Sequence, residues 1–231
     1  MKEAYWAISA VLLLTLEACA TRPKPDYTKF FEHHPRSILV VPPMNKTTAV
    51  DAPVLFSTTV TRPFAERGYY IFPVFLTRDI LNDMGLSDEG LLSQLQPQRF
   101  RETFGADAVL FVTVKAWTTT YVVIASSVTV EAEYRLIDTD TGLVIWETKQ
   151  VAVQQSGGGN IIEMAVRAAL TALMVDYRPL ARQANDLVVK KKREGLPAGP
   201  YATDHQKDYA NYRDESTSSP PTAPEAVAKE K

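Results

Sequence analysis

Three long segments in the middle of the chain carry the pattern of a β-sheet. Residues 108–117 are apolar nearly throughout, as a central strand should be. Apolar and polar residues alternate over 128–137, so one face of this strand should be buried while the other meets water. The turn sequence DTDTG at 138–142 then leads into a returning strand over 143–153. These segments predict an antiparallel meander.

Shorter segments complete the predicted fold. The expected elements are strands over 37–41 and 69–74 and helices over 53–68, 97–105 and 160–175, and Thr77 or Ser87 could cap further short helices. The order β-α-β-α-α-β-β-β-α predicts an α/β fold with a single mixed β-sheet of about five strands and helices packed on it. Its first part should be parallel and its last part antiparallel.

The N-terminus has the pattern of an export signal. The apolar run over 4–16 is about 13 residues long, too short for a membrane span of roughly 20, and indicates a signal peptide at 1–18. The sequence LEAC at 16–19 resembles the lipobox of bacterial lipoproteins, although Glu17 departs from it. Cys19 is the only cysteine, and it is the predicted lipidation site. In bacterial lipoproteins an aspartate after the lipidated cysteine favours the inner membrane, so the resemblance, with Ala20 at this position, implies sorting to the outer membrane.

Composition divides the remaining chain into three parts. Residues 19–36 are polar and proline-containing, which predicts a tether. Residues 195–231 are rich in proline, serine and charge and poor in aliphatic residues, so we expect a disordered tail that cannot offset its ordering entropy by burial. The range 37–194 should form a single periplasmic α/β domain.

Charge and candidate chemistry argue against several function classes. The net charge of -2 and the basic cluster confined to 190–193, near the end of a predicted helix, argue against a nucleic-acid partner. The three histidines, His33, His34 and His205, all fall in predicted linkers. We therefore expect no metal site, no cofactor and no catalytic triad. Asp138 and Asp140 are expected to fix the hairpin turn rather than to bind calcium.

Four motifs together resemble a group of periplasmic lipoproteins. They are PPMNKT at 42–47, RGYYIFPV at 67–74, GADAVLFVTV at 105–114 and DTDTGLVIWE at 138–147. The group is related to the TolB N-terminal domain and includes the curli secretion lipoprotein CsgG and the lipoproteins that activate penicillin-binding proteins. Within it, the chain looks closest to a family of bacterial lipoproteins of unknown function. The resemblance implies a docking or assembly role and no catalytic residues.

The segment with the clearest potential for contact lies between two long predicted strands. Tyr121, Val122, Val123 and Ile124 would form an apolar tip that marks a partner or self-association surface. Alternatively, the strands run longer and bury these residues.

The predicted function is that of a non-enzymatic protein, lipid-anchored in the outer membrane on its periplasmic face. It would act as an interaction or assembly component of an envelope complex, either secretory or peptidoglycan-associated. Its partners would be the membrane, through the lipid, and other envelope proteins, and it could form a homo-oligomer. The alternative is a subunit of a ring-forming or pore-forming secretion oligomer that resembles CsgG.

Overall fold

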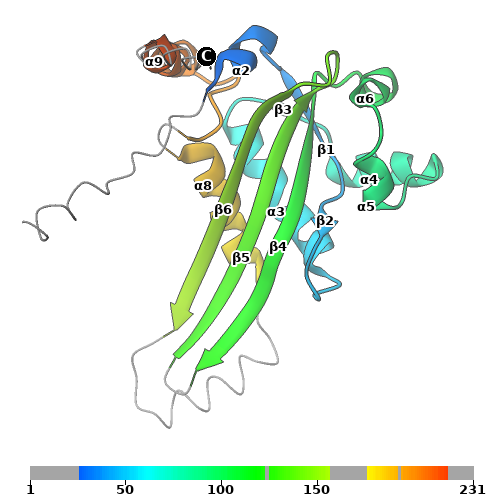
Figure 1. Ribbon diagram of the computed structural model, residues 1–231, viewed down its shortest axis with the longest axis vertical. Helices are drawn as coiled ribbons and strands as arrows, with labels where there is room; N and C mark the ends of the chain where they lie inside the picture. Colours follow the sequence, from blue (N-terminus) through cyan, green and yellow to red (C-terminus); the bar gives the residue numbers. More distant parts are fainter. Residues whose placement is uncertain (1–25, 123–124, 157–175, 192–193, 218–231) are drawn as a thin grey trace, which may run out of the picture.

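One mixed sheet organises the protein in the computed structural model, which describes residues 26–122, 125–156, 176–191 and 194–217 (Figure 1). The elements in chain order are α2 (Thr28–His33), β1 (Ser37–Val40), β2 (Met44–Asn45), α3 (Ala52–Glu66), β3 (Tyr70–Ile71), α4 (Val74–Asp83), α5 (Glu89–Leu92), α6 (Pro97–Phe104), β4 (Ala108–Val122), β5 (Ala125–Asp138), β6 (Val144–Ser156), α8 (Arg178–Lys190) and α9 (His205–Thr217). The predicted α/β class is confirmed, with six strands in the sheet instead of about five.

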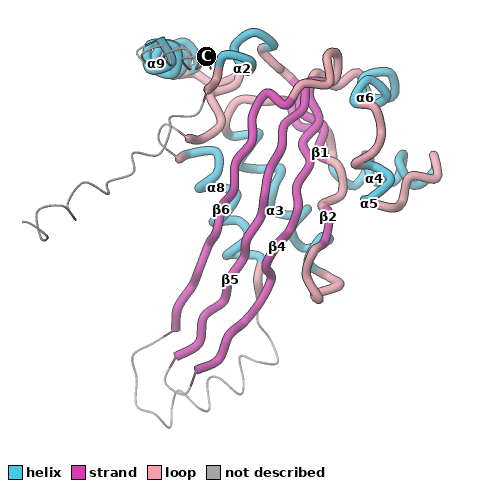
Figure 2. The backbone as a smooth tube through the Cα atoms, in the orientation of Figure 1, coloured by secondary structure: helices cyan, strands magenta, loops and turns pink. Residues whose placement is uncertain are grey.

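The sheet has a parallel part and an antiparallel part, as the element order predicts. Its main path runs β3-β1-β4-β5-β6, and β2 pairs separately with β4. β1 is parallel to both β3 and β4, because helices connect these strands. β4, β5 and β6 form the antiparallel meander, with an irregularity in β4 between Val114 and Ala116. Figure 2 shows the three long strands of this meander side by side.

Two hydrophobic clusters cover opposite faces of the sheet unequally. The larger one joins α3 and α8 to the face of the meander that carries Val130, Ala132, Tyr134 and Leu136. The smaller one lies on the other face, where residues of α4, α5 and α6 pack against β1 and the start of β4. α4 to α6 lie beside β1 and the start of β4 only. Farther along the meander, the two faces of the sheet therefore have different surroundings (Figure 1).

A polar network crosses the larger cluster. The Tyr134 hydroxyl of β5 donates to Oδ1 of Asn185 in α8 (2.9 Å), and Nδ2 of Asn185 donates to Oγ1 of Thr59 in α3 (3.1 Å). All three residues are buried. Burial raises the pKa of the Tyr134 hydroxyl well above its usual range, so this group stays protonated and available as a donor. The network fixes how the two helices pack on the sheet, since any shift would leave buried polar atoms unpaired.

Some local predictions agree with the structure and others differ. The strand predicted over 69–74 shortens to the two residues of β3, because Pro73 has no N–H to donate to the sheet and Val74 is already the first residue of α4. α6 begins at Pro97 and ends at Gly105, whose φ of 70° supplies the left-handed cap that glycine favours. Thr77 and Ser87 are not the helix caps that the sequence suggested: Thr77 is buried within α4, and Asp88 caps α5 by accepting from the Leu91 backbone N–H (2.9 Å). The predicted helix over 160–175 lies outside the described residues.

The predicted tether contains a helix that is part of the core. Tyr27 and Phe30, each 4% exposed, anchor α2 in the larger cluster. The Tyr27 hydroxyl donates to the carbonyl of Gly195, which is 168 residues away in the sequence (2.7 Å). The folded domain therefore begins before residue 37, and the expectation of a tether up to residue 36 is corrected. The helical spacing of Tyr27, Phe30 and Phe31 was the signal for this.

The predicted disordered tail is also partly folded. Leu196 is fully buried, and α9 packs against α2 through a Tyr27–Tyr212 edge contact (4.7 Å between ring centroids). Arg67 Nε donates to the Leu196 carbonyl (2.7 Å), and its guanidinium pairs with Asp208 in α9 (2.6 Å). Residues 195–217 thus belong to the domain. Composition could not reveal this, because long-range donors satisfy the backbone of an otherwise polar segment.

Candidate interaction surface

The face of the meander opposite α3 and α8, beyond the reach of α4 to α6, is the candidate surface. We call it the outer face, and it comprises Lys115, Thr118, Thr129, Glu131, Glu133, Arg135, Glu147, Lys149, Val151 and Val153. Every one of these residues is exposed or half-buried, whereas their neighbours along β5 are buried against the helices. The period-2 alternation of an extended strand produces this contrast. The alternation over 128–137 predicted one wet face, although it did not identify that face as a site.

Charged side chains cross between strands on the outer face. Lys115 Nζ of β4 contacts Glu133 Oε2 of β5 (3.0 Å), and Lys149 Nζ of β6 contacts Glu131 Oε1 of β5 (2.6 Å). The hydrogen bond to Glu131 raises the pKa of Lys149. With Arg135 and Glu147, the outer face holds three basic and three acidic side chains. Such a balanced pattern suits recognition by charge complementarity rather than attraction to a polyanion.

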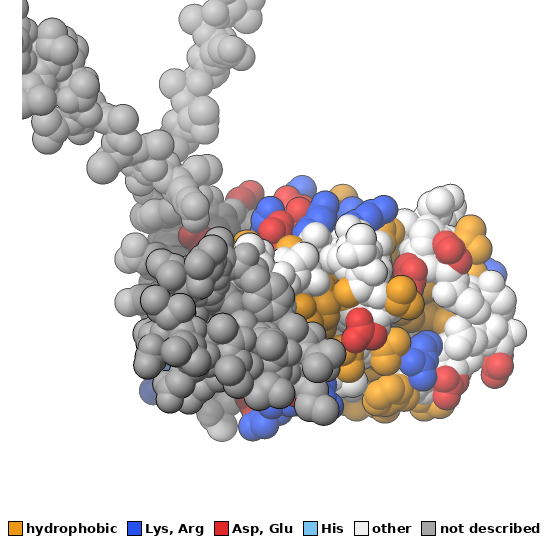
Figure 3. Space-filling view, turned by 90° about the horizontal axis from the view of Figure 1, so that it is seen from below, with side chains coloured by type: hydrophobic (Ala, Val, Ile, Leu, Met, Phe, Trp, Pro, Cys, Tyr) orange, Lys and Arg blue, Asp and Glu red, His pale blue; other side chains and the backbone are white. Residues whose placement is uncertain are grey.

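Apolar side chains join the charged ones toward the far end of β6. Val151 and Val153 project from the outer face and are 42% and 48% exposed. Charged and apolar side chains therefore lie together on the outer face. Seen from below, acidic, basic and apolar side chains are also interspersed over the visible part of the described surface (Figure 3). A mixture of this kind is typical of protein-binding surfaces, which combine apolar area with a polar rim.

The predicted tip and lipidation site stay predictions. Tyr121 and Val122 form the end of β4 and pair with Ser126 and Ala125 of β5. Val123 and Ile124 lie outside the described residues, and the surroundings of all four tip side chains are undescribed as well. The strands do run longer than predicted, since β4 continues five residues past Trp117. Cys19 also lies outside the described part of the chain.

The histidines lie in folded segments rather than in linkers, which corrects the sequence interpretation. His33 Nδ1 lies 3.3 Å from Asp138 Oδ2, and His34 stacks on Tyr209 of α9 (5.4 Å between ring centroids). Burial lowers the pKa of His34. His205 Nδ1 is 2.6 Å from the Ala198 carbonyl. These rings therefore tie α2, the hairpin turn and α9 together.

Asp138 has the structural role that the sequence predicted, but Asp140 does not share it, because the Asp140 side chain is exposed with its Oδ1 4.0 Å from Arg101 Nε. Asp138 Oδ1 accepts hydrogen bonds from the backbone N–H of Asp140 (3.1 Å) and of Thr141 (2.8 Å), and from Oγ1 of Thr141 (2.8 Å). This arrangement fixes the turn before Gly142. Within the described residues, no group of three or more His, Cys, Asp or Glu side chains could hold a metal ion.

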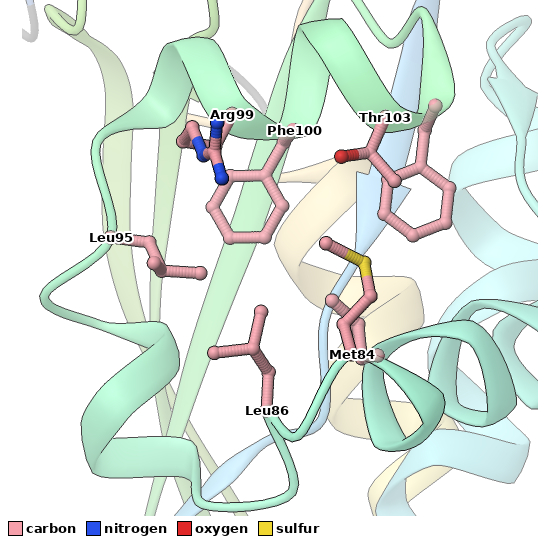
Figure 4. Close-up of a pocket in the computed structure, with 8 residues that line it drawn as sticks. Met84, Leu86, Leu95, Arg99, Phe100 and Thr103 are labelled. Atoms are coloured by element: carbon pink, nitrogen blue, oxygen red, sulfur yellow. The ribbon is translucent and has the colours of Figure 1, made fainter.

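A pocket of ≈ 160 Å³ lies among α4, α5 and α6. Figure 4 shows the side chains of Met84, Leu86 and Leu95 pointing toward the Phe100 ring, with Arg99 above it. Arg99 is the only titratable residue of the lining, and its guanidinium pairs with the exposed Glu102 (3.3 Å). The described lining thus brings no two titratable groups together, as acid–base catalysis would require.

Comparison with known proteins places the chain in a family. The model of the family described as "Putative lipoprotein GNA1162-like" matches residues 25–201. The chain belongs to the GNA1162-like lipoprotein family. A relative from Neisseria meningitidis serogroup B, named "Putative lipoprotein NMB1124/NMB1162", is 30% identical over 218 residues, which cover 89% of this chain and 99% of the relative. The predicted membership of a lipoprotein family is confirmed.

Solved structures of other proteins share the fold to different degrees. The crystal structure of lipoprotein GNA1162 from Neisseria meningitidis has a TM-score of 0.51 at 30% identity, and the match covers 62% of this chain and all of that one. The LpoB C-terminal domain from Escherichia coli has a TM-score of 0.37 at 17% identity, over 52% of this chain and 85% of that one. The similarity to the LpoB domain is too low to support a conclusion about this chain. No described helix of this GNA1162-like protein is long and apolar enough to cross a membrane.

Proposed function

We propose that this protein is an outer-membrane lipoprotein, acylated at Cys19, that acts as a non-enzymatic interaction component of an envelope complex. The proposal places the contact surface on the outer face of the meander and extends it to the tip at Tyr121–Ile124. The observation that supports it is the outer face itself: among the described residues it carries ion pairs between strands and exposed valines, while the opposite face of the meander packs against α3 and α8. Family membership supports the lipid anchor.

The short distance in sequence between Cys19 and the folded domain gives the anchor a defined reach. The first described residue, Asp26, follows Cys19 by seven positions (26 − 19 = 7). A fully extended chain of this length spans at most about 25 Å. An acyl group on Cys19 would hold the α2 end of the domain within this distance of the lipid. The distal ends of β4 to β6 lie at the opposite end from α2 (Figure 1).

Fatty-acid labelling tests the anchor. The wild-type chain expressed in its host should incorporate labelled palmitate and sediment with outer membranes. The Cys19→Ala variant should lose the label and leave the membrane fraction, while its folded domain is unchanged by circular dichroism. A wild-type chain that stays unlabelled and retains residues 1–18 would overturn the anchor proposal.

An exchange of charges tests the surface without removing an ion pair. The double variant Glu131→Lys, Lys149→Glu keeps a pair on the outer face but inverts its direction. The matched control is Arg62→Glu, Glu66→Arg on α3, where an exposed pair has the same 2.6 Å separation. After in-cell crosslinking, envelope proteins that co-purify with the wild type should fall at least about tenfold in yield for the outer-face variant only. Equal yields for both variants, or no specific partner with the wild type, would count against the proposal.

A further inference from the structure

Among the described residues, no strand pairs with the outer edge of β6. β6 is the last strand on the path β3-β1-β4-β5-β6, and its described strand partner is β5 alone. α8 packs on the face of the meander opposite the outer face, where Ala152 and Trp146 are buried in the core. The opposite edge of the sheet differs, because β3 has only two residues and is followed by Pro73. β6 has thirteen residues, enough to pair with another strand.

The usual protection of an edge strand is missing from the distal half of β6. Natural edges carry charged residues, prolines or bulges that prevent pairing with another chain. The segment 150–156, QVAVQQS, contains no charged residue, proline or glycine. Val151 and Val153 within it are two of the exposed large hydrophobic residues of the domain. This stretch is therefore suited to accept a further strand.

The sequence of this edge is complementary to itself. Residues 150–154 read QVAVQ in both directions, with Ala152 at the centre. If two copies of β6 run antiparallel about a two-fold axis at Ala152, Val151 of each copy lies opposite Val153 of the other. Gln150 likewise lies opposite Gln154. Such β-branched pairs on one face stabilise antiparallel sheets, and a two-fold interface requires this kind of self-complementarity.

Charges also permit this pairing. In the same register, Lys149 of one copy lies opposite the uncharged Gln155 of the other. Each Lys149 is neutralised within its own chain by Glu131, at 2.6 Å. No two like charges then face each other over 149–155, so the repulsion that normally separates identical edges is avoided.

We propose that β6 pairs with β6 of a second copy of this chain, antiparallel and centred on Ala152, joining two six-stranded sheets into one continuous sheet. The outer faces of both copies would lie side by side on the joined sheet. This inference depends neither on the lipid anchor nor on an envelope partner, because it rests on the order and exposure of residues in β6.

Cysteine crosslinking tests the register. In the full chain carrying Cys19→Ser, which has no other cysteine, Val151→Cys and Val153→Cys are made separately and the two chains are co-expressed with different tags. After solubilisation in non-ionic detergent and mild oxidation, mixed 151–153 disulfide dimers should form at least about tenfold more than dimers of either variant with itself. Direct opposition brings the Cβ atoms to about 5 Å, against about 7 Å or more on the diagonal. Val50→Cys, at a valine that is 90% exposed in the segment between β2 and α3, controls for random collision.

Sedimentation of the full chain provides an independent readout. The double variant Val151→Lys, Val153→Lys should sediment as a monomer where the Cys19→Ser parent is a dimer, and Val50→Lys should behave like the parent. Mixed dimers no more abundant than the Val50→Cys control would overturn the proposal. So would equal amounts of mixed and self dimers, or a dimer that both lysines leave intact.

Discussion

The two ends of the meander differ in what surrounds them. Near α2, both sheet faces are covered, and the N-terminal and C-terminal segments close over the sheet through Tyr27, Leu196 and Tyr212. Farther along, the helices that the structure describes pack on one face only, and the other face carries ion pairs and exposed valines. Stability is therefore concentrated at the covered end. The outer face contributes little to folding. Substitutions there should therefore affect binding more than stability.

Removal of a large side chain from the larger hydrophobic cluster should reduce stability most. Phe56 of α3 is fully buried and lies near Tyr134 of β5 (6.2 Å between ring centroids). Phe56→Ala should lower the free energy of unfolding by about 3 to 5 kcal/mol, because a cavity replaces the ring. Phe75→Ala, at a ring that is 55% exposed on α4, is the matched control and should cost less than about 1 kcal/mol. Urea denaturation measures both, and similar losses would contradict the assigned core.

The C-terminal segment gives the next effect. Leu196→Ala should lower the free energy of unfolding by about 2 to 4 kcal/mol, since Leu196 is fully buried. Leu143→Ala, at an exposed leucine in the turn before β6, should change it by less than about 1 kcal/mol. Thermal unfolding followed by circular dichroism distinguishes them. An unchanged melting temperature for Leu196→Ala would show that residues after 194 do not stabilise the domain.

The hairpin turn should respond to a smaller degree. Asp138→Ala removes the acceptor of three local hydrogen bonds and should cost about 1 to 3 kcal/mol. Asp140→Ala, two residues away and with an exposed side chain, should cost less than about 0.5 kcal/mol. Chemical denaturation provides the comparison. Equal costs would mean that the Asp138 carboxylate does not organise the turn.

The smallest expected effect concerns the outer face. Lys149→Ala breaks an exposed pair with Glu131 and should leave the urea midpoint of unfolding unchanged. The same variant should weaken the binding of any partner that contacts the outer face. A clear fall in the urea midpoint would show that the outer face serves folding instead.

The sequence predicts elements whose signals are local. The alternation in β5, the turn at Asp138 and the Pro97-to-Gly105 limits of α6 each lie within a few neighbouring residues, and all agree with the structure. The folded terminal segments were missed because their order depends on partners more than one hundred residues away. Arg67 and Tyr27 donate to carbonyls at 196 and 195. Polar composition therefore gave the wrong prediction for the terminal segments, because long-range hydrogen bonds and buried rings hold them in the fold.

The candidate surface could likewise be predicted only in part. One wet face could be predicted from the residues of β5 alone, but its charges and exposed valines come together only when β4 and β6 lie beside that strand. The Tyr121–Ile124 tip remains a prediction from the apolar sequence at a strand bend.

Photocrosslinking in the native host can show whether the outer face contacts a partner. A photoreactive amino acid is placed at Thr118, exposed on the outer face, or at Thr58, exposed on the helical side on α3. We predict that Thr118 gives discrete adducts with envelope proteins or a second copy of the chain, at a yield at least about tenfold above Thr58. Equal or absent adducts at Thr118, with the protein folded and at its normal level, would contradict the account.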